Sequence, residues 1–122
     1  MKSKINLILG ASNNPNRYSK MAIQLLQNRG EDIIAVGAKE AIIGSTEIVK
    51  HLPAHINEVH TITIYLKPSN QKPYEEIILN LKPKRVIFNP GAGNPPFEQK
   101  LKSLGIEVLN ACTLVMIQTN QY

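Results

Sequence analysis

The amino-acid sequence predicts an α/β domain in which helices cover a mostly parallel sheet. Three observations support this. Short apolar segments rich in β-branched residues alternate with segments whose apolar residues recur at helical spacing. The first strand, helix and strand together occupy residues 5–36, close to the roughly 30 residues of a βαβ unit. The chain has 122 residues, 43% of them hydrophobic, which argues for a single domain over residues 1–122.

The first βαβ unit has clear boundaries. Residues 5–9 form an apolar strand that leads into a loop rich in Ser and Asn. A helix is expected over residues 19–29, where Ser19 can cap its start and Gly30 favours the left-handed conformation that ends helices. The second strand is expected at residues 33–36.

The alternation of strand and helix continues along the chain. Strands are expected at residues 61–66, 85–88 and 106–109. A helix with Pro73 in its first turn follows the first of these strands, and a helix capped by Asn94 follows the second. Strands that alternate with helices in this way predict a Rossmann-like, doubly wound fold with five mostly parallel strands and helices on both faces.

Two segments have a less regular pattern. Residues 40–57 contain Ile48, Val49 and Leu52, which could form one short helix. The tail over residues 114–117 is apolar and could pack on the sheet or on another subunit, so we consider a homodimer.

Composition narrows the classes of function. Fourteen basic and nine acidic residues give a formal net charge of +5, which suits an anionic ligand. Asp32 is the only aspartate, which disfavours paired-aspartate chemistry, and Cys112 is the only cysteine, which excludes an internal disulfide and fits a cytoplasmic protein. No apolar run approaches the roughly 20 residues that span a bilayer, so no membrane partner is expected.

Other sites are weakly supported by the sequence. His51 and His55 are four residues apart, but Pro53 between them disfavours one continuous helix, so no metal site is expected. The basic cluster at residues 82–85 lacks interleaved aromatic residues, so no nucleic-acid partner is expected. No motif frames a serine or Cys112 as a nucleophile.

The loops that follow the predicted strands indicate a nucleotide site, because ligands of such folds bind at the carboxyl ends of the strands. Gly10-Ala11-Ser12 follows the first strand, with Arg17 close behind, and this suits a phosphate group. Ser12 and Pro15 replace the second and third glycines of the dinucleotide pattern. Gly37-Ala38-Lys39 follows the second strand and has a cation in place of an acid, which suits a ribose phosphate, as in coenzyme A or NADP.

The same loops resemble a known family. The residues that carry the resemblance are Gly10-Ala11-Ser12, Pro15, Arg17, Tyr18, Ser19, Gly44, Lys67-Pro68, Phe88-Asn89-Pro90-Gly91 and Cys112. This pattern resembles the small stand-alone CoA-binding domains, which are similar to the CoA-binding domain of succinyl-CoA synthetases. The resemblance implies a Rossmann-like fold with a CoA nucleotide across the strand ends. The residues expected to line or shape that site are Gly10, Ala11, Ser12, Arg17, Tyr18, Gly37, Lys39, Lys67, Asn89, Pro90, Gly91 and Cys112.

Three functions follow from these patterns. The first is a cytoplasmic binding module for coenzyme A or an acyl-CoA, without catalytic machinery of its own. The second is an NADP-dependent reductase, which would need a proton donor such as Tyr18 or Tyr65. The third is an interaction protein that uses the apolar tail.

Overall fold

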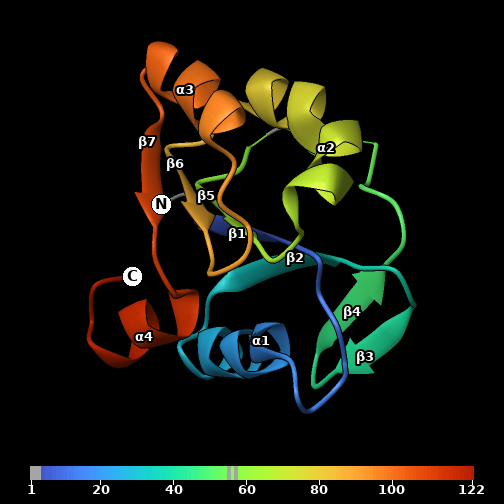
Figure 1. Ribbon diagram of the computed structural model, residues 1–122. Coiled ribbons are helices and arrows are strands. Elements are labelled where there is room, and N and C mark those ends of the chain that lie inside the picture. The colour runs from blue at the N-terminus through green and yellow to red at the C-terminus, as the bar shows by residue number, and fades with distance from the viewer. Residues whose placement is uncertain (1–3, 55, 57) are drawn as a thin grey trace.

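The computed structural model describes residues 4–54, 56 and 58–122. Within them the chain forms seven strands and four helices, which alternate along most of its length (Figure 1). The elements are β1 (Ile5–Leu9), α1 (Tyr18–Asn28), β2 (Asp32–Val36), β3 (Ala41–Ile43), β4 (Thr46–Val49), β5 (Thr61–Ile64), α2 (Pro68–Leu81), β6 (Arg85–Phe88), α3 (Pro95–Ser103), β7 (Glu107–Asn110) and α4 (Thr113–Gln118).

The strands form one sheet in the order β3-β4-β2-β1-β5-β6-β7. Every neighbouring pair is parallel except β3 and β4, which are antiparallel. The five strands predicted from the sequence correspond to β1, β2, β5, β6 and β7. The Rossmann-like class is therefore confirmed, and the predicted strand number is too low by the β3–β4 hairpin.

The hairpin replaces the short helix considered for residues 40–57. Gly44 has a φ of +58° and begins the two-residue turn between β3 and β4. Ile48 pairs with Ala35 of β2 on one side and with Ala41 of β3 on the other. This segment forms a hairpin and not a helix, because the β-branched residues of β4 extend the sheet and Ile48 becomes buried.

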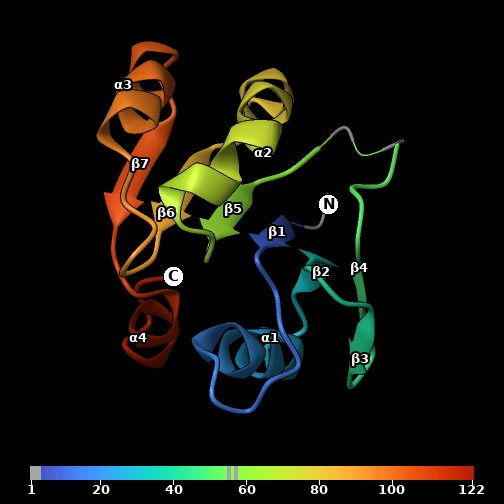
Figure 2. The same cartoon turned by 45° about the vertical axis from the view of Figure 1, so that its right-hand side comes forward.

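Helices cover both faces of the sheet, as Figures 1 and 2 show: α2 and α3 lie on one face, and α1 and α4 lie on the other. Successive residues of β1 point to opposite faces, so Leu7 and Leu9 join one apolar cluster and Ile8 joins the other. On the first face, the rings of Phe88 and Phe97 meet edge to face with centroids 6.1 Å apart. The apolar tail forms α4, which packs beside α1 and buries Ile117 in the second cluster.

Helix ends agree only in part with the sequence prediction. Gly30 and Gly105 have positive φ angles of +73° and +80°, as expected after α1 and α3. Ser19 does not cap α1, because the helix starts at Tyr18 and Ser19 is buried inside its first turn. Asn94 occupies the N-cap position of α3 without a capping bond from its side chain.

Helix α2 starts earlier than the sequence predicted. It begins at Pro68, so Pro73 is its sixth residue and lies inside the helix instead of in the first turn. A proline has no N–H group, so it leaves a carbonyl of the preceding turn without its helical hydrogen bond. Because Pro73 is exposed, water can bind that carbonyl, and the helix tolerates the proline on its solvent side.

A polar cluster closes the amino-terminal edge of the sheet. The Tyr122 hydroxyl donates a hydrogen bond to Asn6 Oδ1 at 2.6 Å, and the Arg85 guanidinium lies 4.5 Å from the centre of the Tyr122 ring. Arg85 Nε donates to Thr61 Oγ1 at 2.9 Å, and the Thr61 hydroxyl also shares a hydrogen bond with His60 Nδ1 at 2.8 Å. These contacts join β1, β5 and β6 to Tyr122.

This cluster predicts a pH dependence of stability. Burial lowers the pKa of His60 below its usual value of 6.5, and the charges of Lys4, Arg85 and Lys84 lower it further, against the opposing effect of Glu31. The unfolded chain therefore takes up a proton at His60 before the folded chain does. Stability should fall as the pH drops through 6.5 toward the folded pKa, and then level off below it.

Urea unfolding between pH 5 and pH 8 measures this effect. His60→Gln should flatten the acid side of the stability profile. His51→Gln, which changes an exposed histidine, should keep the profile of the unaltered chain. An unchanged slope in His60→Gln would assign the pH dependence to other groups.

Candidate functional site

The carboxyl ends of the parallel strands form the candidate site. The chain moves from β1 to β2 and β4 on one side of the sheet and to β5, β6 and β7 on the other, so the strand order reverses between β1 and β5. Loops diverge at such a point and leave room for a ligand. The loops that follow β1, β2, β5 and β6 carry most of the residues predicted from the sequence.

The loop after β1 turns sharply against β2. Gly10 has a φ of +86°, and the backbone N–H groups of Gly10 and Ala11 both donate to the Val36 carbonyl at 2.9 Å. A Cβ atom on Gly10 would lie 3.1 Å from the carbonyl carbon of Tyr65. Glycine is thus required both by its backbone conformation and by the close approach of Tyr65, the residue after β5.

The loop after β2 touches the first loop directly. A Cβ atom on Gly37 would lie only 2.1 Å from the Ala11 carbonyl oxygen and 2.9 Å from a methyl carbon of Ile48. Gly37 N–H donates to the Val49 carbonyl at 2.9 Å and so ties the loop to β4. The first two loops therefore hold each other in place through backbone contact.

The segment between β1 and α1 is braced by its own side chains. Ser12 N–H donates to the buried Ser19 Oγ at 3.1 Å, and Asn14 N–H donates to Ser12 Oγ at 3.1 Å. Asn16 N–H donates to Asn14 Oδ1 at 2.9 Å. The N–H groups of Gly10, Ala11 and Ser12 thus already have partners. An anion at this loop would instead meet the Ser12 hydroxyl and the start of α1.

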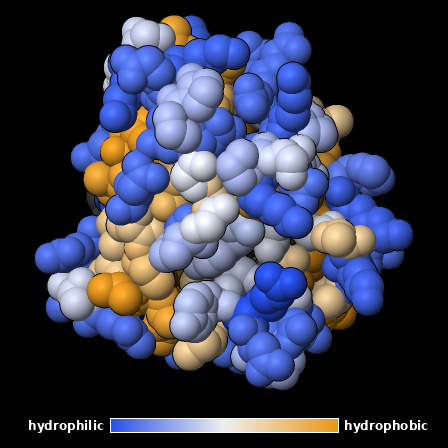
Figure 3. Space-filling model, viewed as in Figure 1, coloured by the Kyte–Doolittle hydropathy of each residue, from blue (hydrophilic) through white to orange (hydrophobic). Residues whose placement is uncertain are grey.

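The cations predicted from the sequence are exposed on neighbouring loops. Arg17 is the N-cap residue of α1, Lys67 is the N-cap residue of α2, and Lys39 lies between β2 and β3. Tyr18 starts α1 with 60% of its surface exposed. The view in Figure 3 is mostly hydrophilic at its rim, and the surface between α1 and the α2–α3 pair has intermediate hydropathy.

The segment after β6 forms a tight turn. Asn89 accepts a hydrogen bond on its carbonyl from Ala92 N–H at 2.8 Å, Pro90 takes the second position, and Gly91 takes the third with a φ of +90°. Proline and a positive-φ glycine at these positions are typical of a type II turn. Pro90 and Gly91 are exposed.

The side-chain amide of Asn89 is hydrogen-bonded within the protein. Asn89 is only 3% exposed, and its Nδ2 donates to Thr63 Oγ1 at 2.9 Å and to the Ile64 carbonyl at 3.0 Å. Its Oδ1 accepts from Thr113 N–H at 2.8 Å. Asn89 therefore joins β5, β6 and α4, and it can shape a site at this edge without presenting a free amide to a ligand.

Cys112 and Tyr65 lie beside this junction. Cys112 is half-buried between β7 and α4. Burial raises the pKa of Tyr65 to about 12, so its phenol stays protonated at neutral pH. The Tyr65 hydroxyl is buried, whereas Tyr18 is largely exposed.

The structure also reveals buried polar residues that the sequence reading missed. Gln71 in α2 bonds to the loops after β5 and β6, and Glu98 in α3 bonds to the start of α3 and to the end of β7. Both positions carry a sequence signal, because Gln71 shares a helix face with Tyr74 and Ile78, and Glu98 shares one with Leu101. A polar residue on an apolar helix face marks a buried hydrogen-bonding group.

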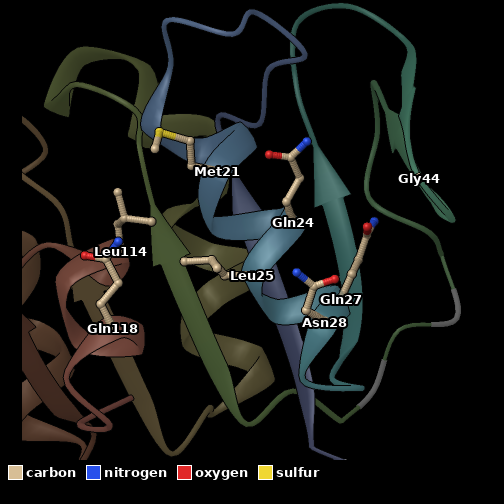
Figure 4. A pocket seen from close by; sticks show the side chains of 8 residues that line it. All are labelled: Met21, Gln24, Leu25, Gln27, Asn28, Gly44, Leu114 and Gln118. Carbon is tan, nitrogen blue, oxygen red and sulfur yellow. The ribbon is translucent and has the colours of Figure 1, made fainter.

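Two hollows of the surface lie away from these loops. The first has a volume of about 510 Å³ and is shown in Figure 4, and the second has a volume of about 450 Å³. The first is lined by Met21, Gln24, Leu25, Gln27, Asn28, Gly44, Leu114 and Gln118, and the second by Leu52, Pro53, Ala54, Ile56, Ile77, Asn80 and Leu81. Neither contains a residue from the predicted ligand site.

In residues 4–54, 56 and 58–122, no group of three His, Cys, Asp or Glu side chains is arranged to hold a metal ion. His55 lies outside the described residues. None of the helices formed by the described residues is long and apolar enough to cross a membrane.

The chain matches one protein-family model and is similar to several solved structures. A protein-family model described as "CoA binding domain" matches residues 4–118. A solved structure of an uncharacterized protein is 41% identical with a TM-score of 0.89, and the match covers 100% of both chains. No curated protein matches the chain.

Two more distant structures share the fold. A Thermus thermophilus protein is 24% identical with a TM-score of 0.82, over 98% of this chain and 91% of the other. A hypothetical protein from Pyrococcus horikoshii is 21% identical with a TM-score of 0.80, over 96% and 82% of the two chains.

The contact at Gly37 gives a test of the first two loops. Gly37→Ala should lower the free energy of unfolding by about 1–3 kcal/mol, because the new Cβ must displace the Ala11 carbonyl. Gly93→Ala is the matched control, since a Cβ there would make an ordinary contact 3.4 Å from Asn110 Oδ1. That variant should stay within about 0.5 kcal/mol of the unaltered chain in urea unfolding. Equal stability of the two variants would contradict the close approach.

Proposed function

Because the chain belongs to the CoA-binding domain family, we propose that it binds coenzyme A or an acyl-CoA across the carboxyl edge of its sheet. The match to that family over residues 4–118 carries the proposal. The strand reversal between β1 and β5, with cations on the surrounding loops, supports the placement of the ligand.

The nucleotide half of the ligand is proposed to lie over the loops after β1 and β2. The start of α1 supplies a favourable dipole for the pyrophosphate, and Arg17 at its N-cap supplies a full positive charge. Gly10 and Gly37 keep this surface low, because a side chain on either would enter neighbouring groups. Lys39, on the next loop, is proposed to meet the ribose phosphate.

The pantetheine arm is proposed to cross toward β5, β6 and β7. Lys67 lies at the start of α2, and Pro90 and Gly91 form the exposed tip of the turn after β6. Cys112 follows β7 on the same edge of the sheet. This course leads the thiol end of the ligand away from Arg17 and Lys39 and toward the half-buried Cys112.

We propose a binding role in preference to catalysis by an NADP-dependent reductase. A reductase needs a proton donor that can reach its substrate. Tyr65, one of the two candidate donors, has a buried hydroxyl whose pKa is raised to about 12. Tyr18 is exposed at the start of α1, where the proposed site for coenzyme A uses its ring as a wall.

The proposed role of Lys39 predicts a preference among nucleotides. Coenzyme A should bind about tenfold or more tightly than dephospho-CoA, because one charge-assisted contact is worth about 1.5–3 kcal/mol. Isothermal titration calorimetry with both ligands measures the difference. Lys39→Gln should remove most of the preference, and Lys100→Gln, an exposed lysine of α3, should leave it intact. Equal affinity of the unaltered chain for both ligands would exclude this role.

The proposed path of the pantetheine arm predicts a covalent adduct at Cys112. On incubation with CoA disulfide, the Cys112 thiolate attacks one sulfur, a protein–CoA disulfide forms, and the second CoA leaves as a thiolate. Intact mass should show one CoA per chain, removable by dithiothreitol and absent in Cys112→Ser. Labelling that occurs only after denaturation would show that Cys112 does not face the ligand.

A further inference from the structure

Gln71 connects two of the loops at the carboxyl edge. It is only 1% exposed, and its Nε2 donates to the Leu66 carbonyl at 2.8 Å and to the Ala92 carbonyl at 2.7 Å. Its Oε1 accepts from Asn94 Nδ2 at 2.9 Å. Both amide hydrogens and the amide oxygen are therefore bonded within the protein.

Glu98 extends the connection to β7. Its Oε2 accepts from Asn94 N–H at 2.6 Å, and its Oε1 accepts from Asn110 Nδ2 at 2.7 Å. The carboxylate is 7% exposed. Gln71, Asn94 and Glu98 thus form a continuous hydrogen-bonded chain, which we name the amide clamp, from the loop after β5 to the end of β7.

The amide clamp fixes the turn after β6. Ala92, whose carbonyl binds Gln71, also closes that turn through its N–H bond to the Asn89 carbonyl. Leu66, the other acceptor of Gln71, directly precedes Lys67. One buried amide therefore sets the distance between the Lys67 loop and the exposed Pro90–Gly91 tip.

We infer that Gln71 is a positioning residue for the pantetheine arm of the ligand. This inference rests on the proposed function. The loops after β1 and β2 are held to each other by backbone contacts that do not involve Gln71, although Gly10 of the first loop also lies against Tyr65 and Leu66. Loss of the amide clamp leaves the Leu66 and Ala92 carbonyls without their donor and lets the two loops move apart. Contacts to the pantetheine arm then suffer more than contacts to the nucleotide half.

The test compares the whole ligand with its nucleotide half. Gln71→Met keeps the length of the side chain and removes all three hydrogen bonds. Calorimetry should show about tenfold weaker binding of coenzyme A, and binding of adenosine 3′-phosphate 5′-diphosphate, which keeps the pyrophosphate, should change less than about twofold. Gln99→Met, the same substitution at an exposed position of α3, should bind both ligands like the unaltered chain.

A second variant guards against misfolding of the first. Asn94→Leu keeps the branched shape of a half-buried residue and removes the donor to Gln71 Oε1 without adding a charge beside Glu98. It should show the same split between the two ligands with a smaller loss. Circular dichroism and thermal melting establish that each variant is folded.

The outcomes separate the two proposals. Equal weakening of both ligands in the folded variants, or no weakening of either, would overturn the positioning role while the unaltered chain still binds coenzyme A. If the unaltered chain binds no coenzyme A, the proposed function itself is wrong, and the ligand role of Gln71 is wrong with it.

Discussion

The carboxyl edge of the sheet depends on the contact between the loops after β1 and β2. The Val36 carbonyl accepts two N–H groups, from Gly10 and Ala11, and the Ala11 carbonyl lies where a side chain on Gly37 would begin. This geometry sets the height of the first loop above the sheet and the direction from which the chain enters α1. The chain then enters α1, with Arg17 as its N-cap residue and Tyr18 as its first residue.

The same contact determines how an anion can be recognised. In the dinucleotide pattern, a glycine-rich loop lets the backbone approach the phosphate closely. Here the N–H groups of Gly10, Ala11 and Ser12 donate to Val36 and Ser19 instead. A phosphate bound at this loop, as proposed, would instead meet the start of α1 and the charge of side chains such as Arg17.

The sequence predicted the fold more completely than it predicted the hydrogen bonds of the candidate site. Hydrophobic periodicity identifies β1, β2, β5, β6 and β7 because each is a short apolar run followed by turn residues. It misses the β3–β4 hairpin, whose strands have only three and four residues and which joins the sheet through the pairing of β4 with β2. It also misses the partners of Gln71 and Asn89, because residues 21 to 26 positions apart are joined by hydrogen bonds that local spacing does not encode.

The two sides of the strand reversal are built by different physical means. On the β2 side, close backbone approach leaves no space for a side chain at Gly37. On the β6 side, the loops are held by hydrogen bonds from the buried side-chain amides of Gln71 and Asn89. Backbone contact at Gly37 leaves a surface without a side chain, which a charged phosphate group could approach closely, whereas the side chains of Gln71 and Asn89 hold the other loops by hydrogen bonds. The coenzyme A proposed for this edge is divided in a similar way, because its nucleotide part carries the phosphate charge and its pantetheine part is uncharged.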